Sequence, residues 1–406
     1  MATVLVIGTL DTKGHELAYV RDAIRRQGLD TLLLDAGVHA PAVEPDISRQ
    51  EVAGAGGVDV SALVAAGDRG GAVAAMTRAA AIKVRELFTQ GRFQGIISLG
   101  GSAGTTIGTA AMQQLPVGVP KLMVSTLASG DTRPYVGSKD ITMMYSVVDI
   151  SGLNRISRTI LGNAAYAIGG MVRGGAAQED GAGDRPLIAA TMFGVTTPCV
   201  TQAREYLEGR GFEVLVFHAT GSGGQAMEAL VSDGFVDGVL DITTTEWCDE
   251  LVGGVLSAGP HRLEAAARRG TPQVVSVGAL DMVNFGPRET VPGKFADRLF
   301  YQHNPTVTLM RTTKEECAEL GRIIAQKLNE STGVTKVLIP LRGVSMIDAQ
   351  GQPFHDAEAD AALFDALRRN LRQDIERVEL DLNINDTEFA LAMAKQIEQL
   401  VSGSRP

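Results

Sequence analysis

Four polar side chains stand within one turn, directly after the first apolar run of the chain. The run belongs to the stretch "VLVIGTLDTKGHEL", which spans residues 4–17 and continues as an amphipathic helix. The four side chains are Thr9, Asp11, Thr12 and Lys13. Main-chain amides and the positive end of a helix dipole favour an anion at such a place, where Thr12 can donate a hydrogen bond and Lys13 can supply a positive charge. The alternative is structural, with Asp11 or Thr12 serving only as the helix cap.

A glycine-rich turn follows another apolar run. The stretch "SLGGSAGTTIGTAAM", residues 98–112, leaves a strand near Leu99 and enters a helix. Its turn residues are Gly100, Gly101, Ser102, Gly104, Thr105 and Thr106. Successive glycines let the main chain wrap a phosphate with N–H groups, and the hydroxyls add donors. The Walker pattern GxxxxGK[ST] is absent from the sequence, so we predict a phosphate site of another kind. The alternative is an ordinary tight turn, which needs fewer glycines.

A long polar segment follows a third apolar run. It covers residues 124–154, and its candidate binding residues are Ser125, Thr126, Gly130, Asp131 and Thr132. Loops of this length inside a compact domain usually carry function. Carboxylates can hold hydrated Mg²⁺ against phosphates. Asp131 or Asp140 could do so here, and Asp131 is the preferred metal ligand.

These three segments each follow a strand that we assign to one parallel sheet. The carboxyl ends of parallel strands meet at one edge of the sheet, next to the amino ends of the following helices. We therefore predict that the three segments converge into one pocket for a phosphorylated ligand.

A dinucleotide fingerprint in the second half offers a competing interpretation. Gly221, Gly223 and Ala226 give the spacing G-x-G-x-x-A between an apolar run and a helix, and Asp241 follows about 20 residues later, as the fingerprint requires. An NAD(P)-dependent oxidoreductase would bind pyrophosphate with such a loop and ribose with such an acid. The run before Gly221 is the second of its half, however, whereas the fingerprint normally follows the first strand.

Apolar runs alternate with helical segments along most of the chain. Runs such as "TVLVIGT", "GIISLGG" and "LIAATMFG" are continuous, as expected for strands buried on both faces of a parallel sheet. The stretch "VRGGAAQEDGAGDRP" has no apolar periodicity and is typical of an exposed linker. We predict an α/β protein with two Rossmann-like doubly wound domains and mainly parallel sheets. Their expected bounds are 1–175 for the N-terminal domain, 176–186 for the linker and 187–406 for the C-terminal domain.

Composition argues against several classes of protein. The chain has 406 residues and a net charge of −10, and an acidic protein repels nucleic-acid strands. Its apolar runs are shorter than the roughly 20 residues of a membrane span, and the first residues lack the basic region of a signal peptide. The three cysteines show no CxxC pairing, which argues against a zinc knuckle or a disulfide framework. We expect a cytoplasmic protein that binds neither nucleic acid nor membranes.

Several stretches, taken together, resemble one family. "VLVIGTLDTKGHEL", "ISLGGSAGTTIGTAAM", the 124–154 segment and "GALDMVNFGP" are similar to the Tm-1-like ATP-binding proteins, also catalogued as the UPF0261 family, and the similarity covers nearly the whole chain. The resemblance implies two Rossmann-like subdomains, ATP with Mg²⁺ in the first, and a homodimer. It places the ATP contacts at positions chosen above and at Gly37 after the second strand. They are Thr9, Asp11, Thr12, Lys13, Gly37, Gly101, Ser102, Gly104, Thr105, Ser125, Thr126, Gly130, Asp131 and Thr132.

In a plant member of that family, which resists a tobamovirus, this region is followed by a TIM-barrel part similar to phosphoenolpyruvate hydrolase-like enzymes. The present sequence ends at Pro406 without such a part, so the antiviral role is not carried over, and a separate TIM-barrel protein is a candidate partner. We expect an ATP-binding protein that acts on an unidentified small molecule between its domains. The alternatives are the NAD(P)-dependent enzyme and a non-catalytic regulatory protein in which ATP locks the domains together.

Overall fold

The chain folds into two compact units. The structure is a computed structural model that describes residues 1–176 and 185–403. Unit 1 comprises Met1–Ala182 and unit 2 comprises Gly183–Pro406. Residues 177–184 of the predicted linker lie outside the described ranges. Each unit has its own sheet and its own apolar cores.

Unit 1 is built on a five-stranded sheet in which all neighbouring strands are parallel. The strands are β1 (Thr3–Gly8), β2 (Asp30–Asp35), β3 (Gly95–Gly100), β4 (Lys121–Ser125) and β5 (Thr142–Tyr145). Their order in the sheet is β2-β1-β3-β4-β5. The chain therefore passes from β2 across β1 to reach β3. The direction of winding reverses between β1 and β3, which is where doubly wound sheets bind ligands.

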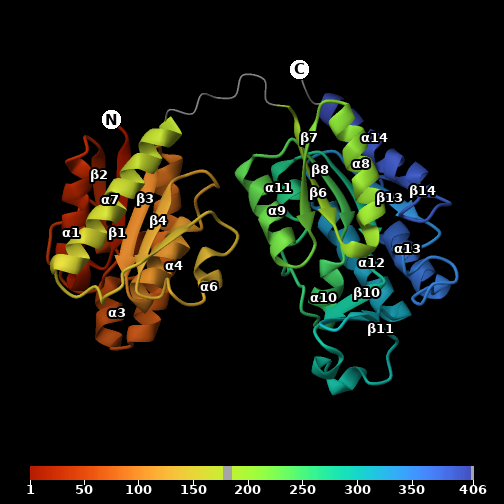
Figure 1. Cartoon of the computed structure of the whole chain (residues 1–406), viewed down its shortest axis with the longest axis horizontal. Helices are drawn as coiled ribbons and strands as arrows, with labels where there is room; N and C mark the ends of the chain where they lie inside the picture. Colours follow the sequence, from red (N-terminus) through yellow and green to blue (C-terminus); the bar gives the residue numbers. More distant parts are fainter. Residues whose placement is uncertain (177–184, 404–406) are drawn as a thin grey trace. The chain divides into compact units, whose positions relative to one another are not determined.

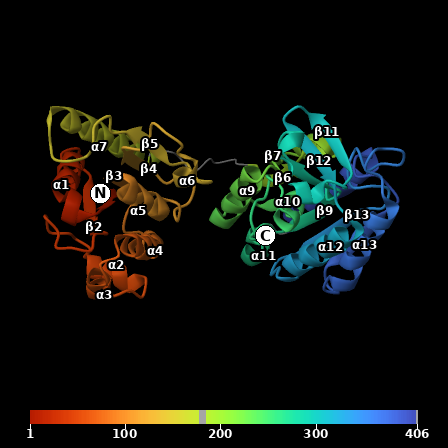
Figure 2. The ribbon, with the colours of Figure 1, turned by 90° about the horizontal axis from the view of Figure 1, so that it is seen from below.

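Helices cover both faces of this sheet (Figures 1 and 2). They are α1 (Leu10–Arg25), α2 (Arg49–Ala55), α3 (Val60–Ala66), α4 (Arg69–Thr89), α5 (Ser102–Met112), α6 (Arg133–Val136) and α7 (Arg155–Ala176). Successive strand residues point to opposite faces. Val4 and Val6 of β1 accordingly pack with α1 and α7, whereas Leu5 and Ile7 pack with α4 and α5. The continuous apolar runs of the sequence reflect this two-sided burial.

Unit 2 repeats the winding in a six-stranded parallel sheet. The strands are β6 (Leu187–Met192), β7 (Glu213–His218), β8 (Gly238–Thr243), β9 (Gln273–Gly278), β13 (Thr335–Pro340) and β14 (Glu376–Leu380). Their order is β14-β13-β9-β8-β6-β7, so the chain again crosses its own first strand between the second and the third. The predicted fold class, an α/β protein with two Rossmann-like halves and mainly parallel sheets, is confirmed.

The helices of unit 2 also form two layers. They are α8 (Thr197–Gly209), α9 (Ser222–Asp233), α10 (Glu246–Val252), α11 (Ala265–Arg269), α12 (Lys314–Asn329), α13 (Ala357–Asn370) and α14 (Thr387–Gly403), with short 3-10 turns at Gly194–Thr196, Arg288–Thr290 and Gly293–Phe295. Helices α8 and α14 pack together on one face of the sheet, and α9, α11, α12 and α13 cover the other. Among the described helices of both units, none has the length and apolarity needed to cross a bilayer.

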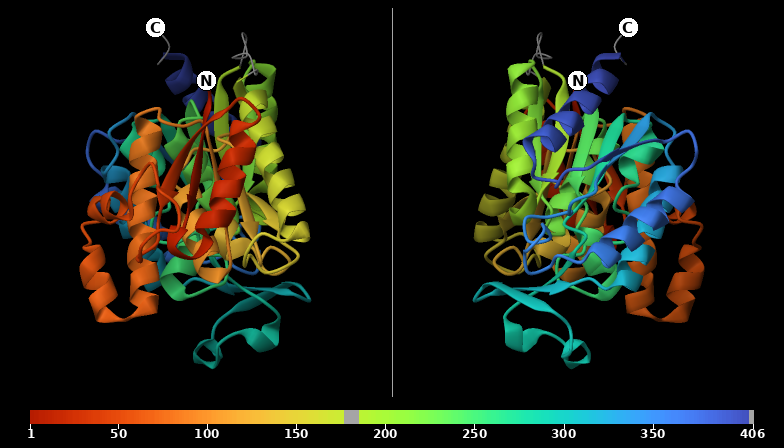
Figure 3. Two further views of the ribbon diagram at one scale, coloured as in Figure 1. Left: turned by 90° about the vertical axis from the view of Figure 1, so that its left-hand side faces the viewer. Right: turned by 90° about the vertical axis from the view of Figure 1, so that its right-hand side faces the viewer.

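Unit 2 also contains a small antiparallel sheet that was not among the predicted elements (Figure 3). It contains β10 (Met282–Phe285), β11 (Phe300–Asn304) and β12 (Val307–Arg311), in the order β10-β12-β11. The apolar run "QVVSVGALDM" looks like one strand, but Ala279 adopts a left-handed φ of 57° and separates β9 from β10. Left-handed backbone is normally signalled by glycine, so the alanine conceals the break.

The polar segment 124–154 is not a single loop, contrary to the prediction. It contains the short helix α6 and the edge strand β5. The side chains of β5 are exposed or only partly buried. An edge strand of this kind lacks the continuous apolar run that marks the central strands, which explains why it escapes recognition.

Candidate functional site

A pocket of about 430 Å³ opens at the carboxyl edge of the unit 1 sheet. The turns after β1, β2 and β3 line one side of it, and α3 and α4 line the other, so it lies where the winding reverses. Its volume is within the range of about 300–1,000 Å³ that is typical of small-molecule sites. The lining residues are Thr9, Asp11, Thr12, Ala36, Gly37, Val38, His39, Leu63, Val64, Gly67, Asp68, Arg69, Ala72, Val73, Met76, Ala103 and Ile107.

The turn after β1 contributes hydroxyls from Thr9 and Thr12. Thr9 occupies the N-cap position of α1, rather than Asp11 or Thr12, and its own side chain makes no capping hydrogen bond. The Thr9 and Thr12 Oγ1 atoms are 2.8 Å apart and share a hydrogen bond. In the first turn of α1, the N–H of Leu10 is bound by the carboxylate of Asp35 and the N–H of Thr12 by the main-chain oxygen of Thr9, so the two hydroxyls are the main donors that this turn offers to the pocket.

The carboxylate of Asp11 joins this turn to the turn after β2. Its Oδ2 accepts hydrogen bonds from the main-chain N–H groups of Val38, at 3.2 Å, and His39, at 3.0 Å. Gly37 is required beside it, because a Cβ there would lie 2.8 Å from the Asp11 Cγ. Asp11 Oδ1 is buried and has no hydrogen-bond partner in the described part of the chain. Leaving a buried carboxylate oxygen unpaired is costly, so this atom is poised to accept from a ligand.

A second carboxylate fixes the same two turns from the interior. Asp35 Oδ1 accepts from the N–H of Leu10 at 3.1 Å and from the N–H of Gly37 at 2.9 Å. Burial raises the pKa of Asp35, and Arg49 is the nearby cation, with Nη1 at 3.9 Å from Oδ2. The carboxylate of Asp35 therefore holds the start of α1 and the turn after β2 together through hydrogen bonds.

The glycine turn after β3 brings the amino end of α5 to the pocket, where Ala103 lines it. Gly101 is the N-cap residue, and within the described ranges this helix also has no side-chain cap. A Cβ on Gly100 would lie 2.8 Å from the Cα of Gly104, so glycine is needed for strand and helix to touch. The first-turn amides of α5 can therefore meet an anion in the pocket.

Several other predicted contacts lie around this turn without lining the pocket. Thr105 is buried, and its Oγ1 is 2.7 Å from Ser125 Oγ, which ties α5 to the end of β4. Thr126 stands next to Gly101, where a Cβ would be 3.7 Å from its Oγ1. The remaining predicted positions in this region are Ser102, the first residue of α5, and Gly130 and Thr132, which precede α6.

Two predicted charged contacts have other partners. Lys13 Nζ donates to the main-chain oxygen of Ile150. The guanidinium of Arg133 binds Asp131, with Nε to Oδ1 at 2.9 Å and Nη2 to Oδ2 at 2.8 Å. This hydrogen bonding lowers the pKa of Asp131 to about 2. Of the four charged or hydroxyl residues quoted first from the sequence, Thr9, Asp11 and Thr12 line the pocket.

The apolar wall of the pocket did not emerge from the sequence. It comes from α3, α4 and α5, and its residues are Leu63, Val64, Ala72, Val73, Met76 and Ile107. A signal for the helices was nevertheless present. Ser48 and Glu51 form a capping box before α2, and Asp59 caps α3, both of which can be recognised by spacing.

The dinucleotide alternative is not favoured by the geometry of unit 2. The turn at Gly221 does open α9, but the carboxylate of Glu246 already takes its amides, with Oε1 at 2.7 Å from Gly221 N and 3.1 Å from Gly224 N. Asp241 lies inside β8, and two N–H groups of Arg262 bind its carboxylate at 2.6 and 2.7 Å. Both the phosphate position and the ribose-binding acid are thus engaged within the protein.

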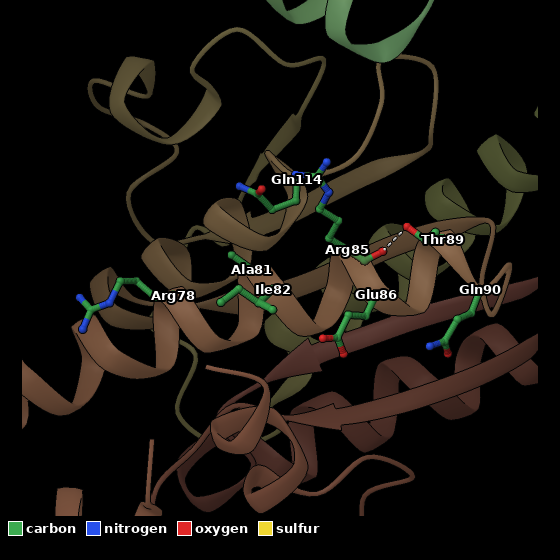
Figure 4. A pocket seen from close by; sticks show the side chains of 8 residues that line it. All are labelled: Arg78, Ala81, Ile82, Arg85, Glu86, Thr89, Gln90 and Gln114. Carbon is green, nitrogen blue, oxygen red and sulfur yellow. Dashed lines mark hydrogen bonds between the residues drawn. The ribbon is translucent and has the colours of Figure 1, made fainter. Parts of the chain in front are cut away.

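A shallow groove on unit 1 is larger, at about 660 Å³, but chemically poorer. Figure 4 shows its side chains along α4, with Gln114 from the turn that follows α5. Its charged residues include Arg78, Arg85 and Glu86, and Glu86 is 3.5 Å from Lys83. The groove follows one helix surface, and its polar groups do not converge as those of the first pocket do (Figure 4).

Two family models together span nearly the whole chain. The N-terminal domain of the uncharacterised protein family UPF0261 matches residues 2–177, and the C-terminal domain of the same family matches residues 185–401. The chain belongs to the UPF0261 family. The boundary between the two matched domains, between residues 177 and 185, includes the boundary between the two structural units at residues 182 and 183.

Relatives support this assignment. A UPF0261 protein of Clostridium tetani is 57% identical over 396 residues, which are 97% of this chain and 98% of that protein. The ToMV susceptible protein tm-1(GCR26) of Solanum lycopersicum is 40% identical over 413 residues, 96% of this chain and 54% of the tomato protein. The ToMV resistance protein Tm-1(GCR237) of the same plant is 44% identical over 343 residues, with coverages of 83% and 45%. The predicted resemblance to Tm-1-like proteins is confirmed.

Solved structures add little to this UPF0261 assignment. A putative UDP-N-acetylglucosamine 2-epimerase from Listeria monocytogenes aligns over 94% of this chain with 13% identity and a TM-score of 0.24. Another UDP-N-acetylglucosamine 2-epimerase aligns with 11% identity and a TM-score of 0.24. TM-scores this low do not indicate a shared function.

Proposed function

We propose that unit 1 of this UPF0261 protein binds ATP in the pocket beside β1 and β3. The observation that carries the proposal is the meeting of two helix amino termini at one pocket beyond the carboxyl ends of a doubly wound sheet: the α1 terminus, where Thr9 and Thr12 present hydroxyls, and the α5 terminus, which has no side-chain cap. Such termini offer main-chain N–H groups and a positive dipole end to a phosphate. The hydroxyls of Thr9 and Thr12 add donors at the first of them.

The opposite wall supports a nucleotide rather than a bare phosphate. It is formed by aliphatic and methionine side chains of α3, α4 and α5, against which a flat purine can pack. Arg69, the first residue of α4, and His39 also line the pocket and can add positive charge near an anionic ligand. A pocket with one polar and one apolar side matches the two ends of ATP.

Magnesium accompanies ATP in most of its protein complexes and neutralises phosphate charge. The residues present fit such an ion, because Asp11 places a buried, unpartnered carboxylate oxygen at the pocket. Mg²⁺ keeps several waters and takes one or two carboxylates, so Asp11 would hold it there. Asp131, which the sequence suggested for this role, is bound by Arg133 instead.

A cytoplasmic location is part of this proposal, because ATP is available there. A homodimer and a separate TIM-barrel partner of the phosphoenolpyruvate hydrolase-like type remain predictions that rest on the family resemblance. An unidentified small-molecule substrate also remains a prediction.

Isothermal titration of the full chain with ATP and Mg²⁺ tests the proposal. We expect one ATP per chain, and we expect NADH to show no binding under the same conditions because the amides at Gly221 are already bonded to Glu246. Absence of heat with ATP at millimolar concentration, or binding of NADH in preference to ATP, would contradict it.

A further inference from the structure

Beyond β9 and β13, unit 2 buries three aspartates around one arginine. Asp281 follows β9, Asp348 lies in the segment after β13, and Asp360 is in the first turn of α13; each is at most 5% exposed. Arg311, the last residue of β12, donates from Nη2 to Asp348 Oδ1 at 3.2 Å and to Asp360 Oδ1 at 2.8 Å. Four separate segments of the chain therefore place charged side chains close together at the carboxyl edge of the sheet.

The arginine balances only part of this negative charge. The guanidinium of Arg311 binds two of the three carboxylates, those of Asp348 and Asp360. Its Nε donates to the main-chain oxygen of Phe354 at 2.7 Å. Asp281 lies outside these ion pairs, and its negative charge acts on the guanidinium through space. Nearby cations are engaged outside the cluster, since Lys314 pairs with Glu358 and Arg342 pairs with Asp381. An excess of buried negative charge is costly unless a further cation or proton enters.

Asp281 shows the imbalance most directly. Its Oδ2 accepts from Ser345 Oγ at 2.8 Å, but its Oδ1 is fully buried without a hydrogen-bond partner in the described ranges. The same Ser345 Oγ accepts from the N–H of Asp348 at 3.1 Å. The hydroxyl of Ser345 thus links the carboxylate of Asp281 to the main chain of Asp348, the aspartate that Arg311 binds.

His355 completes the cluster from the solvent side. Its Nδ1 lies 3.1 Å from the main-chain oxygen of Asp348, which can only accept, so Nδ1 carries the proton in this hydrogen bond. In the neutral ring, Nε2 then keeps its lone pair. Metal-binding histidines show this arrangement, in which the second ring nitrogen donates to a carbonyl or a carboxylate and fixes the ring. Ligand atoms of Asp348, His355 and Asp360 all lie within 4.8 Å of one another.

We propose that Asp348, His355 and Asp360 bind a divalent first-row transition metal, with Zn²⁺ and Mn²⁺ as the leading candidates. An imidazole with two carboxylates suits these ions better than Mg²⁺ or Ca²⁺, which prefer oxygen ligands alone. A double positive charge, added to that of Arg311, would balance the three aspartates. All of the proposed ligands belong to unit 2, whereas the proposed ATP pocket is lined by residues of unit 1.

The cluster has an opening through which an ion can enter. A pocket of about 240 Å³ is lined by His355 and Asp360, together with Leu341 and Phe364. Arg342 and Arg368 also line it, and their charges are paired with Asp381 and Glu379. His355 is exposed, whereas Asp348 and Asp360 are buried. An ion could therefore reach the histidine first and be held by the two carboxylates behind it.

Metal titration of the full chain tests this proposal. The protein is treated with a chelator, dialysed, and titrated calorimetrically with Zn²⁺ and Mn²⁺, and Co²⁺ absorption serves as a spectroscopic probe. We expect one tightly bound ion per chain. His355→Ala and Asp360→Asn should each weaken binding by more than about 100-fold, since even loss of an outer partner costs about 10–100-fold.

His303→Ala is the matched control, because His303 is an exposed histidine of unit 2 in β11. It should bind the ion as the unmodified chain does. His355 is exposed, so His355→Ala keeps the fold and remains informative even if Asp360→Asn unfolds. The proposal is overturned if none of the three ions binds stoichiometrically, or if binding survives unchanged in His355→Ala.

Discussion

Ala103→Glu is expected to weaken ATP binding by at least about 100-fold, a loss of about 2.7 kcal/mol. Ala103 lines the pocket and is the second residue of α5. A glutamate there would place a carboxylate at the helix end where we propose the phosphates bind. Acidic residues in a first helical turn stabilise the helix itself. The loss of affinity should therefore come without loss of the fold, and titration calorimetry with circular dichroism measures both.

Two control variants separate charge from size. The glutamine of Ala103→Gln has nearly the same shape as glutamate but no charge, and we expect this variant to weaken ATP binding much less than Ala103→Glu. Thr106 was predicted to add a donor to the phosphate site, but it lies outside the pocket lining and its hydroxyl donates to the main-chain oxygen of Ser102 at 3.0 Å. Thr106→Glu therefore adds the same charge on an exposed position of α5 away from the pocket, and it should bind ATP almost normally. Unchanged affinity in Ala103→Glu, or an equal loss in Thr106→Glu, would contradict the phosphate position.

Gly104 is a poorer probe of the same turn. A Cβ on Gly104 would lie 3.3 Å from the main-chain oxygen of Leu99. A bulky residue there would push α5 away from β3, so a loss of binding could not be separated from a loss of structure. Ala103 avoids this difficulty because its side chain already faces the pocket.

The second large effect is expected in unit 2, where Arg262→Met should lower the free energy of unfolding by about 3–5 kcal/mol. Arg262 is 1% exposed and binds Asp241 through Nη1 and Nη2, and its Nε donates to Glu246 Oε2 at 2.8 Å. Without the guanidinium, both carboxylates would remain buried without a cation, and Glu228, which lies 3.2 Å from Arg262 Nη1, would lose the same partner. Glu246 also accepts a hydrogen bond from the N–H of Gly221. A shift of the Glu246 side chain would therefore disturb this turn and the start of α9.

Trp247 provides the measurement for this variant. It is the single tryptophan of the chain, it is buried in α10, and it follows Glu246 directly. Its fluorescence during denaturant unfolding therefore reports on unit 2 alone. Arg268→Met is the control, because Arg268 has a largely exposed side chain that pairs with Glu264, and we expect a change within about 0.5 kcal/mol. Equal stability of the two variants would show that the buried network contributes little.

The sheet cores were predictable because their strands are buried on both faces. Val4 to Ile7 and Ile96 to Leu99 are buried without interruption, and such runs with intervening helices identify doubly wound sheets. The edge strand β5 and the antiparallel sheet of β10, β11 and β12 were harder to predict from the sequence. β5 is only partly buried, and the left-handed Ala279 hides the turn into β10.

The site was predictable where main-chain geometry decides it. Thr9, Asp11, Thr12 and Gly37 follow strands directly, so topology alone brings them to one pocket. Lys13 is different, because a long flexible side chain takes its partner from tertiary structure, here the main-chain oxygen of Ile150.

Partners that lie at a distance in the sequence limit such predictions more generally. The glycine spacing at Gly221 matches a dinucleotide loop, but the anion that its amides bind is Glu246. Asp131 lies in the segment where we predicted a metal ligand, but its carboxylate forms an ion pair with the neighbouring Arg133. Spacing shows which main-chain amides are available, and only the folded structure shows which side chain already uses them.

The central claim is that ATP binds at the carboxyl edge of the unit 1 sheet, and peptide-level hydrogen exchange with and without saturating ATP and Mg²⁺ tests it most directly. We predict slower exchange in the turns at residues 9–13, 36–39 and 101–106, with unit 2 unchanged. Protection confined to unit 2, or unchanged exchange in all three turns at saturation, would contradict the account.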